Sequence, residues 1–143
     1  ARISHVIDTP IMTDESVFDP KTVLYGARNR IADIFSLKIM KSGGIRRALE
    51  VAAIARAAGI EIYGGCMFET GLAHAAGTHL MAAVPNLVLE CEFYTATYYA
   101  KEDILTEPFP VRGGRVHVPS GPGLGVSVDP DMLVKYAATE VLV

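Results

Sequence analysis

The stretch SLKIMKSGG, residues 36–44, places a lysine inside a run that otherwise predicts a buried β-strand. Successive side chains of a strand point to opposite faces. One face of the run IFSLKI (34–39) is therefore wholly apolar, and the other carries Ser36 and Lys38. We expect the apolar face to contact helices and the polar face to point into a barrel, where a lysine at the C-terminal end of a strand belongs to the reaction site. The alternative is a lysine that bends out of the strand end into water.

Three more β-like runs follow the same pattern at a nearly constant interval. With IFSLKI, the runs begin 24, 26 and 27 residues apart: PIM (10–12), IEIYGG (60–65) and LVLECEF (87–93). Helix-like segments separate them: DPKTVLYGARNRI (19–31), IRRALEVAAIARAAG (45–59) and TGLAHAAGTHLMAAV (70–84). Alternating strands and helices at this period are typical of βα units and a parallel sheet. We therefore predict an α/β fold, and weak repetition without a solenoid consensus favours part of a barrel.

The last quarter of the sequence leaves this pattern. RVHV (115–118) and GVSV (125–128) predict short strands between Gly- and Pro-rich turns, and DPDMLVKYAA (129–138) predicts a short helix. We expect residues 1–107 to form the βα part and residues 108–143 to pack elsewhere.

Composition excludes several classes of protein. The chain has 143 residues and a net charge of -3, without a basic run, which argues against a nucleic-acid partner. Its apolar stretches are interrupted by polar residues, so no membrane span is expected, and its start lacks signal-peptide architecture. Cys66 and Cys91 are too few and too far apart for a zinc motif or a disulfide framework. They predict buried thiols in a cytoplasmic protein.

Each predicted strand ends in ionisable residues. In chain order these are Asp14 and Glu15, then Lys38, then Glu69, and finally Glu90 and Glu92. Adjacent parallel strands lie about 5 Å apart, so these groups are expected to share one rim. Clustering charge there does not help folding, and the pattern therefore favours a functional site over solvated loop charges.

Other polar residues receive structural interpretations. Lys41, beyond the second strand, is expected to be solvated. His74 and His79 lie five residues apart, which is not the spacing of a metal-binding helix face, so they predict helix packing.

The chain resembles the C-terminal part of the enolase superfamily, in its muconate-lactonizing subgroup. The matching segments are PIMTDES, LKIMKSGGIRRA, AAGIEIYGGCMFETGLAHAAGTHLMAA, ECEFYTATYY with KEDIL, and PGLGVSVDPDML. The resemblance implies that residues 1–107 are the second half of a modified TIM (β/α) barrel. It also implies that residues 108–143 pack on the barrel and return to an α+β capping domain. Because a complete member is more than twice as long, the chain is expected to be a fragment or one piece of a split protein.

The resemblance also implies an activity. It is that of a metal-dependent cycloisomerase, which interconverts cis,cis-muconate and muconolactone through an enediolate-type intermediate in aromatic compound degradation. Asp14 matches a ligand of Mg²⁺ or Mn²⁺, and Lys38 matches the lysine at the reacting carbon of a small carboxylate substrate. A partly buried lysine beside another cation is expected to have a lowered pKa. The other metal ligands and a second lysine pair would lie in the missing half, so this chain alone is expected to be inactive.

The remaining acidic residues have less specific matches. Glu92 matches a proton donor after the last barrel strand, and Glu90, which by strand alternation shares its face, is the rival. The segment TATYY is one residue longer than the family pattern, so the register at Glu92 is open. Glu15 and Glu69 match substrate-binding or metal-supporting positions, with structural salt bridges as the alternative.

Two alternative functions stay open. The Glu-x-Glu pair resembles the acidic pair that dipeptide epimerases use to hold an amine, so an epimerase or an N-acylamino acid racemase of the same superfamily is one alternative. A non-catalytic βα module that packs on a partner chain is the alternative from another class. By resemblance, the complete enzyme is a cytoplasmic homo-oligomer, with octamers common.

Overall fold

The computed structural model describes residues 3–93 and 96–137 of the chain. Thr95 of the segment TATYY, Ala138 of the predicted C-terminal helix and the end of the expected tail, 139–143, lie outside the described residues.

Four parallel strands form the sheet that the sequence predicts. In spatial order they are β1 (Met12–Thr13), β2 (Ile34–Leu37), β3 (Glu61–Gly64) and β4 (Leu87–Cys91). Because neighbours in the sheet are also neighbours in the sequence, all four C-terminal ends lie at the same edge. The predicted α/β fold is confirmed.

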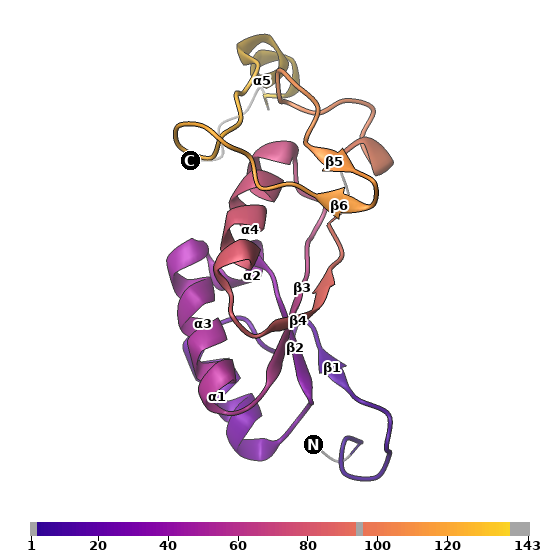
Figure 1. Cartoon of the computed structure of the whole chain (residues 1–143), viewed down its shortest axis with the longest axis vertical. Coiled ribbons are helices and arrows are strands. Elements are labelled where there is room, and N and C mark those ends of the chain that lie inside the picture. The colour runs from indigo at the N-terminus through magenta and orange to yellow at the C-terminus, as the bar shows by residue number, and fades with distance from the viewer. Residues whose placement is uncertain (1–2, 94–95, 138–143) are drawn as a thin grey trace.

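The helices of this part lie together on one face of the sheet (Figure 1). They are α1 (Pro20–Asn29), α2 (Ile39–Ser42), α3 (Ile45–Ala57) and α4 (Gly71–Ala83). Asp19 starts α1 with a capping box, in which its carboxylate accepts from Thr22 N and its own N–H donates to Thr22 Oγ1. The short α2 was not predicted: β2 ends at Leu37, so Ile39 begins a helix instead of continuing the strand.

The hydrophobic core lies between the sheet and these helices. Phe35 and Leu37 of β2 are buried there, against helix residues such as Val51 and Leu80. This confirms the prediction for the apolar face of IFSLKI. Figure 1 shows no helix on the opposite face of the sheet, and Met12 of β1 and Leu89 of β4 remain 45% and 46% exposed. Exposed sheet edges and uncovered apolar faces are surfaces that folded proteins usually cover or pair.

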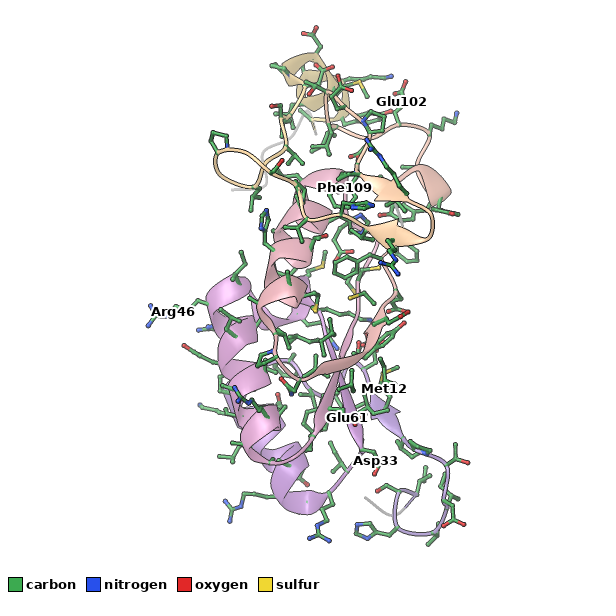
Figure 2. All side chains as sticks on the ribbon, viewed as in Figure 1. Met12, Asp33, Arg46, Glu61, Glu102 and Phe109 are labelled. Carbon is green, nitrogen blue, oxygen red and sulfur yellow. The ribbon has the colours of Figure 1, made fainter. Side chains whose placement is uncertain are left out.

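The tail forms a separate layer beyond the N-terminal end of α4. The tail, residues 108–143, contains the antiparallel pair β5 (Val111–Arg112) and β6 (Arg115–Val116), and α5 (Pro130–Tyr136), and the 3₁₀ turn η1 (Ala96–Tyr98) precedes it. The expected strand GVSV is wrong as a strand, because only Val128 pairs, with Leu105, in an isolated bridge. Figure 2 shows Phe109 where the tail meets α4. No helix in the described residues is long and apolar enough to cross a membrane.

Candidate active site

The ends of β1 and β2 bring a lysine and two carboxylates together. Lys38 directly follows β2, and its side chain is only 6% exposed. Its Nζ donates to Asp14 Oδ2 at 2.7 Å and to Glu15 Oε1 at 3.1 Å. Asp14 and Glu15 follow β1. The sequence therefore correctly predicted that these residues share one rim, and Lys38 does not bend out into water.

A glycine at the end of β3 leaves the space that the Lys38 side chain occupies. A Cβ at Gly65 would lie 2.8 Å from Lys38 Cγ, 2.9 Å from Lys38 Cε and 2.4 Å from Ser36 Oγ. Real Cβ atoms essentially never show contacts this short. Gly65 N also donates to Leu37 O at 3.0 Å, which fixes the two strand ends against each other. The path of the lysine from β2 therefore depends on the absence of a side chain at position 65.

Lys41 is the residue at this rim that the sequence interpretation missed. Its side chain is 9% exposed, so the expected solvated position is wrong. Its Nζ donates to Asp14 O, to Asp14 Oδ1 at 2.9 Å and to Ser36 O at 3.2 Å. The cause is α2: one helical turn places residues 38 and 41 on the same side. The three-residue spacing of the two lysines was the available signal.

Charges at the rim change the pKa values of the paired groups. Burial raises the pKa of Asp14, but hydrogen bonds and charge from Lys38 and Lys41 outweigh it, and the net pKa is lowered. Burial lowers the pKa of Lys38, but Asp14 and Glu15 outweigh it, and the net pKa is raised. The expected lowered pKa of Lys38 is therefore wrong for this chain, because the lysine faces two carboxylates. Both partners are charged at neutral pH.

The two glutamates of the fourth strand do not occupy equivalent positions. Glu90 sits in a bulge of β4 with φ 67°, and it is exposed. The bulge interrupts strand alternation, so alternation no longer supports the expectation that Glu90 and Glu92 share a face. Glu92 is half-buried just past β4, where its N–H donates to Gly64 O at 2.9 Å. Among the described residues, Lys38 hydrogen-bonds Asp14 and Glu15 and not Glu92.

Glu69 lies in a second polar cluster, beside α4. It is 4% exposed, and its Oε2 accepts from Met67 N at 2.5 Å and lies 3.8 Å from His74 Nε2. Its carbonyl oxygen accepts from the Tyr99 hydroxyl. Burial lowers the pKa of His74, against a weaker opposing effect of Asp103, so this histidine is neutral at neutral pH. Its ring stacks on Phe93 and tilts against Phe109, both at 5.8 Å between ring centroids, which fits the predicted packing role.

The rim residues fit one part of a site for Mg²⁺ or Mn²⁺. Such ions take oxygen ligands, chiefly carboxylates and water. The Asp14 side chain is 41% exposed. Its carboxylate forms ion pairs with the ammonium groups of Lys38 and Lys41, which shows that positive charge is favoured next to it. Glu15 is 68% exposed beside it. Asp14 fits as one ligand, and a complete set requires further oxygen donors.

Comparison with known proteins identifies the family. The enolase C-terminal domain-like family matches residues 1–132, and the chain belongs to it. This confirms the resemblance to the enolase superfamily, whose members use divalent metal ions.

The relatives include cycloisomerases and an epimerase. A chloromuconate cycloisomerase from Pseudomonas putida is 39% identical, over 92% of this chain and 35% of its own length. A muconate cycloisomerase from Azorhizobium caulinodans is 44% identical, with a TM-score of 0.83, over 94% of this chain and 38% of its own. The L-Ala-D/L-Glu epimerase from Bacillus subtilis is 36% identical, with a TM-score of 0.77, over 85% and 33%. The chain thus spans about a third of the length of these relatives.

Proposed function

We propose that this chain is the C-terminal barrel half of a metal-dependent cycloisomerase, which interconverts cis,cis-muconate and muconolactone in aromatic compound degradation. One observation carries the proposal: the buried Lys38 Nζ lies 2.7 Å from Asp14 Oδ2 at the C-terminal ends of adjacent parallel strands. Folding alone does not favour such a pair, since burying charge costs free energy. Relatives 39% and 44% identical are named as cycloisomerases of chloromuconate and muconate.

Each rim residue has a distinct role in this proposal. Asp14, with carboxylates from the rest of the enzyme, holds Mg²⁺ or Mn²⁺, which supplies positive charge opposite the substrate carboxylate. Lys41 holds Asp14 through Oδ1 and the backbone oxygen. Lys38, protonated at neutral pH, holds the proton exchanged at the reacting carbon. Glu15 orients the Lys38 ammonium through the bond at 3.1 Å.

The acidic residues after β3 and β4 have weaker assignments. Glu92 is the proposed second proton donor, by its match to the family position. Its backbone N–H donates to Gly64 O, which holds the residue at the end of β4. Glu90 is exposed on a bulge, which suits a contact with substrate or with the rest of the enzyme. We retain Glu69 as a residue that supports the β3–α4 loop beside the substrate.

The partner of this chain is the rest of the barrel and its capping domain. The bare face of the sheet and the unpaired outer edges of β1 and β4 in the described residues require a covering layer. Residues 1–107 are proposed to complete the barrel, and residues 108–143 to pack on it and on the capping domain. Cys66 and Cys91 form no disulfide among the described residues, which suits a reducing cytoplasm. A homo-oligomer, with an octamer by family, is a prediction for the complete enzyme.

A second candidate function is dipeptide epimerisation. The observation that favours it is the Glu90-x-Glu92 pair, together with the likeness to the Bacillus subtilis epimerase. The same alternative covers an N-acylamino acid racemase, since each reaction moves a proton beside a carboxylate.

Substrate assays of the complete enzyme separate these functions. With Mg²⁺ or Mn²⁺, loss of cis,cis-muconate and appearance of muconolactone are expected, and a chelator should stop both. Epimerisation of L-Ala-L-Glu without muconate turnover would replace the proposal with the second candidate. No turnover of muconate, dipeptide or N-acylamino acid by metal-loaded enzyme would favour the non-catalytic module.

A further inference from the structure

Three buried side chains of different chemistry converge between the end of β3 and the start of α4. Cys66, Glu69 and His74 are 6%, 4% and 2% exposed. One potential ligand atom from each, a thiol sulfur, a carboxylate oxygen and an imidazole nitrogen, lies within 4.8 Å of the other two. All three line one small cavity, which Phe93 also lines.

His74 provides an independent indication that this cluster binds something. Neither of its ring nitrogens has a hydrogen-bond partner among the described residues, although the residue is 2% exposed. Buried polar atoms are almost always paired. The cavity has no room for a water molecule, so water does not supply the missing partner. A bare metal ion is smaller than water and pairs with the lone pair of a neutral imidazole.

The charges of the cluster also match a divalent ion. Among the described residues, the buried Glu69 carboxylate has Met67 N and the more distant His74 ring as its contacts. A thiolate and a carboxylate together carry two negative charges, which neutralise one divalent cation in a low-dielectric interior.

We propose that Cys66, Glu69 and His74 form a binding site for Zn²⁺ or a similarly thiophilic divalent ion. Sulfur and imidazole ligands select Zn²⁺ over Mg²⁺ and Mn²⁺, so this site differs in chemistry from the oxygen site at Asp14. The proposal does not depend on the proposed catalytic function. The ion would tie the β3–α4 loop to α4, next to Gly65, which contacts Lys38.

Binding requires small local changes. Ligand bonds of about 2.0 to 2.3 Å at tetrahedral angles put ligand atoms about 3.3 to 3.8 Å apart. The three side chains supply three of the four ligands, so the local changes must also admit a fourth, such as a water molecule. The distance between Glu69 Oε2 and His74 Nε2 is already 3.8 Å. Cys66 donates its thiol hydrogen to Glu92 O at 2.9 Å. On binding, this proton leaves to solvent, and a weak hydrogen bond is exchanged for a metal–sulfur bond.

Co²⁺ is the probe that tests the site, because a thiolate ligand gives it a charge-transfer absorption in the near ultraviolet. The full chain, freed of metal by a chelator, is titrated with Co²⁺ and then with Zn²⁺. We expect one Co²⁺ per chain with the thiolate band, complete displacement by Zn²⁺, and no displacement by excess Mg²⁺. Absence of the band at excess Co²⁺, or displacement by Mg²⁺, would overturn the proposal.

Matched variants assign the ligands. Cys66→Ser should abolish the band, and His74→Gln should weaken Co²⁺ binding by more than the roughly 10- to 100-fold cost of losing a supporting residue. Cys91→Ser and His79→Gln, which change the second cysteine of the chain and another histidine of α4, should leave binding unchanged. Circular dichroism checks that each variant is folded. If His74→Gln does not fold, the result for Cys66→Ser decides the test. A band that persists in folded Cys66→Ser, or disappears in folded Cys91→Ser, contradicts the assignment.

Discussion

Position 65 controls the geometry of the rim, because a single methyl group there would collide with the catalytic candidate. We expect Gly65→Ala to displace the Lys38 stem, because the new methyl carbon would lie 2.8 Å from Lys38 Cγ and 2.9 Å from Lys38 Cε. In the complete enzyme, kcat should fall by about 10²-fold, since a misplacement of about 1 Å typically costs this much. Steady-state kinetics with the metal saturating measures the effect.

Gly77→Ala is the matched control for this change. Its Cβ would meet only the Phe93 ring, at 3.2 Å, on the helix side of the sheet. Activity close to that of the wild type is expected. Equal losses in the two variants would mean that the Gly65 effect is general destabilisation and not displacement of Lys38.

At the same scale, strand alternation in the sequence was enough to place Lys38 but not Lys41. The alternation of IFSLKI fixed which side chains face the core, and the structure agrees for Phe35 and Leu37. The position of the Lys41 side chain depends on α2, a four-residue helix that begins because β2 ends at Leu37. The cluster of Cys66, Glu69 and His74 was likewise not predictable from the sequence, because mixed ligands have no fixed spacing motif.

At the scale of elements, α1 ends in a conformation that its sequence does not favour. Arg30 caps the helix with φ 47° and ψ 53°, the left-handed region, which costs a residue with a Cβ about 1 kcal/mol. We expect Arg30→Gly to raise the free energy of unfolding by about 1 kcal/mol in urea denaturation. Arg28→Gly, inside the same helix, removes the same charge and should lower it by about 1 kcal/mol. If Arg30→Gly is no more stable than the wild type, this conformation is not strained.

Element types were more predictable than their ends. The four strands and three long helices follow from hydrophobic periodicity and from signals such as Asp19-Pro20. The bulge at Glu90 was not predictable, because a left-handed glutamate has no sequence signature and pairing with β3 decides it. In the tail, β6 is shorter than the expected RVHV because it pairs with β5 at two positions. GVSV forms no strand because only Val128 pairs, with Leu105.

At the scale of the whole molecule, the chain combines a formed cluster of charged residues with an open sheet. Lys38 and Lys41 both donate hydrogen bonds to the Asp14 carboxylate. In the described residues, by contrast, the sheet has two unpaired outer edges and one face without helices (Figure 1). The sequence predicted this arrangement through the nearly constant interval between its strands and through the family motifs. The substrate was not predictable, because the chain spans about a third of its relatives.

The most direct test of the account is kcat for cis,cis-muconate in the complete enzyme with Lys38→Ala. Removing a group that holds the transferred proton typically costs about 10²- to 10⁴-fold, and we expect a loss in this range with the fold intact. Lys38→Arg should fail as well, because the planar guanidinium keeps the charge but does not reproduce the point contact that the ammonium makes. Arg46→Ala, at a side chain 94% exposed on α3, is the control and should keep full activity. A Lys38→Ala enzyme that turns over muconate at the wild-type rate would contradict the account.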